Sequence, residues 1–184
     1  MSGVSSRLLD PLRRFRVMEE ARFIECQPEE IPQVFRNLLV HSGDMTSKLA
    51  AFHQCQIALE VLQCGEGMEG QYNREVILRN AGTGEAVEYG AIEIFLETVP
   101  EVLRMNVIEG KIPLGGLLNT HGVRYHSEPQ AFFCVRKEPL LCELLRAPLQ
   151  SEFYGRCNIL RTENKSVLAR ILEVLPLVND MRQV

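Results

Sequence analysis

The stretch FYGRCNILRTENKSVLARILEVLP, residues 153–176, decides the fold class. It is typical of two strands around a turn at Glu163-Asn164-Lys165, because apolar residues flank a polar cluster of turn-forming type. Further strands are predicted in 56–64, 74–80, 80–95 after a glycine-containing turn, and 131–135. Strands linked by short hairpins run antiparallel, so we expect one antiparallel sheet.

Helical spacing of apolar residues predicts the remaining elements. Helices are expected in 28–43, from Met45 to about His53, and in 98–108, 113–121 and 137–146. Asp44 is a candidate N-cap for the second of these helices. The predicted fold is α+β, a single domain over residues 29–184 with its helices on one face of the sheet, preceded by an N-terminal extension, residues 1–28.

Composition excludes several classes of function. The chain has 184 residues, 46% hydrophobic and 24% charged, with a formal net charge of −4. That charge predicts neither nucleic-acid binding nor attachment to an anionic membrane surface, and the apolar runs are too short to span a bilayer. The first residues lack the apolar segment of a signal peptide, and the six cysteines include no Cys-x-x-Cys pair. We therefore expect a cytoplasmic protein with reduced, mostly buried thiols.

Two charged residues fall on apolar strand faces. Strand alternation places Glu173 beside Ile171 and Leu175, and it places Arg74 beside Val76 and Leu78. A buried charge is costly unless it has a partner. Either these two residues form a structural pair or lie in water at strand ends, or they occupy opposite ends of a cavity. In the second case, the guanidinium would clamp a ligand carboxylate through two hydrogen bonds.

Motifs for a nucleophile or a metal do not occur in this sequence. His121 and His126 are five residues apart and lack neighbouring ligands of metal-site type. The glycines at 65–67 and 82–84 are typical of turns rather than of a phosphate loop. We therefore predict no metal site and expect either ligand binding or a reaction that depends on positioning and electrostatics.

An ordered set of motifs resembles the chorismate pyruvate-lyase (4-hydroxybenzoate synthase) family, especially its divergent bacterial and archaeal branch. The set covers roughly residues 30–177 and consists of Asp44-Met45-Thr46, Arg74-Glu75, Ile112-Pro113-Leu114-Gly115, and Glu173 shortly before Pro176. The resemblance implies an antiparallel sheet of about six strands with an internal ligand cavity. It also implies a cofactor-independent carbon–oxygen lyase that eliminates pyruvate from chorismate and leaves a hydroxybenzoate.

The same resemblance assigns roles to individual residues. Arg74 would bind the ring carboxylate, and the Leu114 amide would contact the same group. Glu173 would contact the ring hydroxyl, so Arg74 and Glu173 are the candidate catalytic residues. Met45 would lie against the substrate. Pro113 suits the first turn of a helix, and Gly115 would let the backbone approach the ligand closely.

Two departures from the family pattern leave a second hypothesis open. Leu172 stands where the best-known lyases have threonine, and Ile112 replaces the threonine before the Pro-Leu-Gly motif. The alternative is a non-catalytic domain that binds a small aromatic acid, because the same fold serves as the effector-binding domain of bacterial transcription regulators. Residues 1–28 show no helix-turn-helix pattern, which argues against a self-contained regulator. In both hypotheses the partner is a small molecule.

Overall fold

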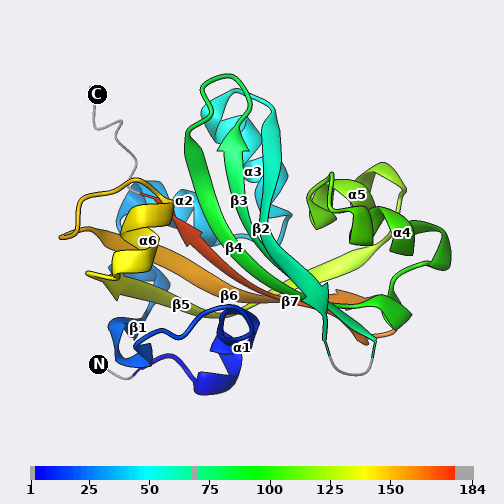
Figure 1. Cartoon of the computed structure of the whole chain (residues 1–184), viewed down its shortest axis with the longest axis horizontal. Coiled ribbons are helices and arrows are strands. Elements are labelled where there is room, and N and C mark those ends of the chain that lie inside the picture. Colours follow the sequence, from blue (N-terminus) through cyan, green and yellow to red (C-terminus); the bar gives the residue numbers. More distant parts are fainter. Residues whose placement is uncertain (1–2, 68–69, 177–184) are drawn as a thin grey trace.

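The structure is a computed structural model that describes residues 3–67 and 70–176. One antiparallel sheet organises the chain, with strand order β1-β5-β6-β7-β4-β3-β2 (Figure 1). Its strands are β1 (Phe23–Cys26), β2 (Ile57–Glu66), β3 (Gln71–Asn80), β4 (Ala86–Phe95), β5 (Tyr125–Arg136), β6 (Glu152–Thr162) and β7 (Val167–Leu175). The predicted α+β fold with one antiparallel sheet is therefore confirmed.

The helices are short and lie between the strands in sequence. They are α1 (Asp10–Arg13), α2 (Gln33–Leu39), α3 (Met45–His53), α4 (Glu101–Glu109), α5 (Leu114–Thr120) and α6 (Pro139–Leu144). Single turns of 3-10 helix add η1 (Ser6–Leu9), η2 (Glu20–Arg22), η3 (Pro28–Glu30) and η4 (Leu96–Thr98). Asp44 caps α3 as predicted, because its side chain accepts a hydrogen bond of 2.7 Å from the Ser47 amide.

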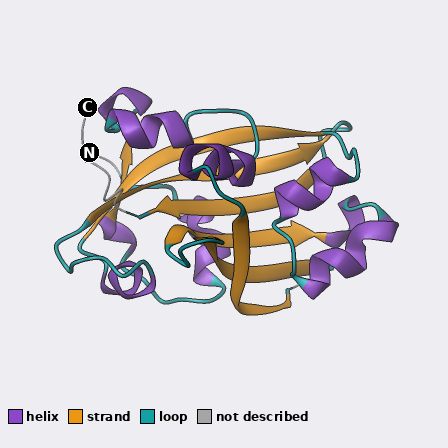
Figure 2. Ribbon diagram, turned by 90° about the horizontal axis from the view of Figure 1, so that it is seen from above, coloured by secondary structure: helices purple, strands orange, loops and turns teal. Residues whose placement is uncertain are grey.

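Helices cover both faces of the sheet, a difference from the one-sided arrangement expected from sequence. In Figure 2 the strands form a continuous layer with helices arranged around it. Helices α2 to α5 pack on the face that carries Leu78, Ile92 and Ile94. The opposite face, which carries Ile77, Tyr89 and similar residues, is covered by η1, α1 and α6. We call these the cavity face and the second face.

The N-terminal residues account for the difference. Val4, Leu9 and Leu12 are buried against the second face, so the first part of the chain completes the core. Strand β1 pairs with β5 from Phe23 opposite Val135 to Cys26 opposite Phe132, which makes seven strands instead of about six. Placing a domain boundary at residue 28 stays a prediction, although residues before it contribute to the sheet.

Two further sequence predictions concern cysteines and membranes. All six cysteines are free thiols, and three of them, Cys134, Cys142 and Cys157, are buried. Cys64 is exposed, so the expectation of mostly buried thiols holds for only half of the set. In the described part of the chain, no helix has the length and apolar character that a membrane crossing requires.

Candidate ligand-binding site

A cavity of about 70 Å³ lies between the cavity face and the starts of α3 and α5. A buried water needs about 10–15 Å³ by this measure, so the space suits a small molecule of a few heavy atoms or a single ring. Most of the wall is apolar, with a few charged groups among the apolar side chains. Its lining includes Met45, Leu59, Arg74, Val76, Leu78, Glu88, Gly90, Ile92, Leu114, Gly115, Tyr125, Arg156, Asn158, Leu160, Ile171 and Glu173.

The structure brings all five residues singled out by the sequence into this cavity. Arg74, Glu173, Met45, Leu114 and Gly115 all line it. Arg74 comes from β3, Glu173 from β7 and the other three from the helix starts. The strand alternation used for the prediction was therefore correct for both charged residues. Their contacts with a ligand stay a prediction.

Arg74 is almost completely buried and has few partners. Its side chain is 2% exposed, and its Nη1 donates only a long hydrogen bond of 3.5 Å to the Val107 carbonyl. Its Nε has no hydrogen-bond partner in the described part of the chain. Burial lowers the pKa of the guanidinium, but an arginine side chain remains charged in a protein. Arg74 therefore presents a buried positive charge without a carboxylate partner among the described residues.

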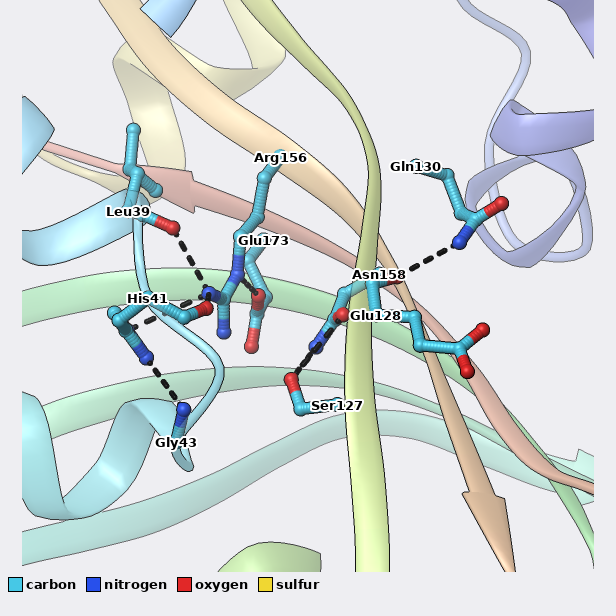
Figure 3. A network of polar contacts seen from close by, with 9 residues as sticks. All are labelled: Leu39, His41, Gly43, Ser127, Glu128, Gln130, Arg156, Asn158 and Glu173. Atoms are coloured by element: carbon cyan, nitrogen blue, oxygen red, sulfur yellow. Dashed lines mark hydrogen bonds and ion pairs between the residues drawn. The ribbon is translucent and has the colours of Figure 1, made fainter. Parts of the chain in front are cut away.

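Glu173 pairs with a residue that sequence analysis missed. Arg156, on the neighbouring strand β6, lies opposite Glu173 in the register, and its Nε donates to Glu173 Oε2 (Figure 3). The guanidinium also donates through Nη1 to the carbonyls of Leu39 at 2.9 Å and His41 at 3.1 Å. Arg156 thus ties the cavity floor to the connection between α2 and α3. The predicted alternative of an Arg74–Glu173 pair is wrong.

Glu88 is the second residue that sequence analysis missed. It lies on β4, opposite Leu78 on β3, and its side chain is 4% exposed. One carboxyl oxygen, Oε2, is buried without a hydrogen-bond partner in the described structure. Burial, followed by the nearby Glu173 carboxylate, raises the pKa of Glu88 well above its ordinary value, although Arg156 opposes this shift.

Gly90 leaves room for Glu88 on the floor of the cavity. It lies two residues from Glu88 on the same strand face and opposite Glu173 on β7. A Cβ atom at this position would stand 3.1 Å from Val76 Cγ2 and 3.4 Å from Glu88 Oε1. A glycine inside a strand often marks a place where another group approaches the backbone closely. The absence of a side chain here keeps the floor open between the two ends of the cavity.

The Pro-Leu-Gly motif has a packing explanation in this structure. Pro113 precedes the first helical residue of α5, Leu114, and a Cβ atom on Gly115 would lie 2.9 Å from Asp44 Cβ. Asp44 also accepts a hydrogen bond of 2.9 Å from the Asn119 side chain. Gly115 is therefore required by the close contact between α5 and the start of α3, and the predicted approach of a ligand to its backbone is not needed to explain it.

Tyr125 and Asn158 complete the polar part of the wall. Burial raises the pKa of Tyr125 to about 12, so its hydroxyl is a neutral hydrogen-bond donor at physiological pH. Asn158 is held by Ser127, because its Nδ2 donates to Ser127 Oγ at 3.0 Å. The unsatisfied hydrogen-bonding capacity of the cavity thus resides in Arg74, Glu88 and Arg156, whose Nη2 has no hydrogen-bond partner in the described structure.

Solved structures identify the fold, whereas the two sequence comparisons find no match, neither to a family model nor to a curated protein. Among solved structures, PhnF from Mycobacterium smegmatis matches with a TM-score of 0.59 and 10% identity over 75% of this chain and 65% of that chain. This chain therefore spans less than two thirds of the whole PhnF chain. The effector domain of PhnF matches with a TM-score of 0.55 and 10% identity, over 73% of this chain and 89% of that domain.

A third solved structure matches with a similar TM-score and a similarly low identity. A possible transcriptional regulator, YydK from Bacillus subtilis, has a TM-score of 0.52 and 11% identity over 67% of this chain and 59% of that chain. The shared fold is that of the effector domain of GntR-family transcription regulators, which is chorismate lyase-like. The resemblance found in the sequence is therefore confirmed for the fold.

The neighbours contradict the predicted enzyme. They are regulator effector domains, which are not enzymes, and no chorismate lyase stands among the matches named for this chain. The prediction of a lyase that converts chorismate to pyruvate and 4-hydroxybenzoate is therefore wrong. The catalytic roles predicted for Glu173 and Arg74 depended on that reaction and lose their basis. The error arose because one fold hosts unrelated functions, so motifs that position a cavity do not specify its chemistry.

Proposed function

We propose that this chain is a non-catalytic sensor domain that binds a small carboxylic acid, with an aromatic ring, in the cavity. The observation that carries the proposal is the buried guanidinium of Arg74, which lines the cavity without a carboxylate partner in the described structure. Burying a charge is unfavourable unless a counter-charge is supplied. A ligand carboxylate supplies that counter-charge through the two-pronged geometry that a guanidinium favours.

The rest of the cavity suits an apolar ring. Val76, Ile92, Leu114 and Ile171 surround the space beyond Arg74. Small-molecule sites are commonly lined in this way, with apolar walls for affinity and a few polar groups for orientation. The likeness to the PhnF effector domain supports a sensor over an enzyme, since that domain has the same fold and covers most of this chain.

The proposal is tested by calorimetric titration of the chain with benzoate and with benzamide, which has the same shape and no charge. We expect benzoate to bind and benzamide to bind at least about 10-fold more weakly, because charge-assisted hydrogen bonds contribute about 1.5–3 kcal/mol. Arg74→Met should weaken benzoate binding by about 10²-fold, and Arg74→Lys should recover only part of it.

A matched control lies on the same strand. Arg79 also belongs to β3 but forms its ion pair with Glu60 outside the cavity, so Arg79→Met should leave benzoate affinity unchanged. The proposal is wrong if Arg74→Met binds benzoate as well as the unmodified chain does. It is also wrong if benzamide competes as strongly as benzoate.

A further inference from the structure

The cavity has a second polar end, formed around Glu88. The sheet register places Arg74 opposite Ile92, four residues along β4 from Glu88. At about 3.3–3.4 Å per residue, the two backbone positions are about 13 Å apart along the strands. Both side chains line the same cavity, so a ligand held at Arg74 would have Glu88 within the same space.

Two carboxyl groups at this end, those of Glu88 and Glu173, lie near the guanidinium of Arg156, which in the described structure forms an ion pair with Glu173 only. Arg156 is fully buried, and its Nε is engaged by Glu173 while its Nη1 is engaged by the carbonyls of Leu39 and His41. Only Nη2 is left over, and neither it nor Glu88 Oε2 has a hydrogen-bond partner in the described structure. Glu88 thus lies in an apolar cavity beside a carboxylate whose charge is already compensated.

We propose that Glu88 faces the ligand as a neutral carboxylic acid and donates a hydrogen bond to an uncharged acceptor at the end of the ligand opposite its anion. This inference rests on the proposed function, and it narrows the ligand to a small acid whose far end carries an oxygen or nitrogen acceptor and no positive charge. The ligand acceptor would lie beside Glu88 Oε2, which has no hydrogen-bond partner in the described structure.

The charged groups around this end of the cavity act on the protonation of Glu88 in opposite directions. Glu173 on β7 and the burial of Glu88 favour its neutral form, whereas Arg156 on β6 opposes it. Burial and the nearby Arg156 lower the pKa of His41 to about 4, so this side chain adds no positive charge near neutral pH. The remaining charged or titratable groups that line the cavity are Arg74, Tyr125 and Asp44.

The opposite assignment makes a different prediction. An ionised Glu88 would select a ligand with an ammonium group, that is, a zwitterion such as an amino acid. Ionisation would also place two carboxylates beside one guanidinium in an apolar cavity, which is the arrangement that a shared proton normally relieves. The two assignments are separated by the charge of the far end of the ligand.

Three para-substituted benzoates provide the ligand test. They carry an acetyl group, which accepts a hydrogen bond, an isopropyl group of nearly the same shape, or an aminomethyl group, which is cationic. We expect the acetyl compound to bind about 2- to 10-fold more tightly than the isopropyl compound, the range for one neutral hydrogen bond. Glu88→Leu should remove this difference. Tighter binding of the aminomethyl compound would overturn the inference.

Carbon-13 NMR of the glutamate carboxyl groups tests the same point without a ligand. The Glu88 resonance is identified by its loss in Glu88→Gln, and we expect it to keep the chemical shift of a carboxylic acid at neutral pH. A carboxylate shift for Glu88 at neutral pH would overturn the inference while leaving the proposed function intact. If none of the benzoates binds in an Arg74-dependent manner, the proposed function fails, and the NMR result still decides the state of Glu88.

Discussion

The two faces of the sheet bury charged residues to the same extent, but the charged residues of the two faces differ in their hydrogen-bond partners. On the second face, Glu75 and Glu93 are 0% exposed, and on the cavity face Arg74 is 2% and Glu88 is 4% exposed. Glu75 accepts three hydrogen bonds from Arg16, at 2.9 and 3.2 Å from Nε and at 2.9 Å from Nη2, and one of 2.7 Å from the Tyr89 hydroxyl. Arg74 and Glu88 have no comparable partners in the described structure.

Under the proposed function, the partners of a buried charge, and not its burial, distinguish a structural role from a ligand-binding role. On the second face some of the partners come from the N-terminal residues, since Arg14 contacts Glu93 and Arg16 contacts Glu75. These contacts fix the N-terminal segment to the sheet. Glu93 also pairs with Arg170 on β7 at 2.9 Å.

On the cavity face Arg156 and Glu173 pair with each other, but polar atoms of Arg74 and Glu88 have no hydrogen-bond partner in the described structure. Unpartnered buried groups are unfavourable for stability and are expected where a ligand completes a site.

The largest expected effect is the loss of a partner on the second face. Arg16→Met leaves the Glu75 carboxylate buried with only Tyr89 and Gln63 as hydrogen-bond donors, so the free energy of unfolding should fall by about 3 kcal/mol. Urea unfolding measures the change. Adding Glu75→Gln to Arg16→Met should recover more than half of the loss, because the unpaired charge is removed. A loss below about 1 kcal/mol for Arg16→Met would show that the buried charge of Glu75 does not depend on its arginine partner.

A smaller effect concerns pH and the cavity face. The raised pKa of Glu88 means that its contribution to stability is fully present below the ordinary glutamate pKa of 4.5 and is lost as pH rises towards the raised value. Glu88→Gln has no proton to lose, so from about pH 5 to about pH 7 the unmodified chain should lose up to about 1.4 kcal/mol per pH unit relative to this variant. The lowered pKa of His41 makes stability rise with pH instead of fall. His41 is present in both proteins, so its effect cancels in the comparison.

Urea unfolding of both proteins across that pH range measures the relative slope. Glu88→Asp serves as a titratable control, and we expect its stability to keep a dependence on pH in the same direction as the unmodified chain. Parallel curves for Glu88→Gln and the unmodified chain would show that Glu88 is ionised over the whole range.

The smallest expected effect is a gain in stability. Arg74→Met replaces an uncompensated buried charge by an apolar side chain of similar length, and Met fits irregular cavities well. The free energy of unfolding should rise by about 1 kcal/mol, as happens when a functional group that is unfavourable for folding is removed. Thermal and urea unfolding measure it without ligand. A loss comparable to that of Arg16→Met would mean that Arg74 has a structural partner like those of the second face.

Strand alternation predicted the directions of side chains but not their partners. It placed Arg74 and Glu173 on the cavity face, because successive residues of a strand point to opposite faces whatever the neighbouring strand is. The partner of Glu173 depends on the register of the β6–β7 hairpin, which sets Arg156 opposite it. The same alternation, applied to Tyr154, Arg156 and Asn158 or to Glu88, Gly90 and Ile92, contained the signal for both missed residues.

The N-terminal residues were harder to predict for a different reason. Strand β1 has four residues, too few to show an alternation, and Leu9 and Leu12 lie in turns of helix that are too short for a recognisable period. Their place is fixed by contacts with the second face, that is, by tertiary structure. The reaction was mispredicted because sequence motifs described the shape of the cavity, and shape is shared by proteins that convert a ligand and proteins that only hold it.

On strand β3, two neighbouring charged residues point to opposite faces of the sheet. Arg74 and Glu75 are consecutive, so a single peptide unit separates the charge that faces the cavity from the charge that holds the N-terminal segment. A displacement of the backbone at Arg74 would therefore also move Glu75, whose side chain binds Arg16. If a ligand altered the backbone at Arg74, the change would reach the ion pair that holds the N-terminal segment through one peptide unit, without intermediate side chains.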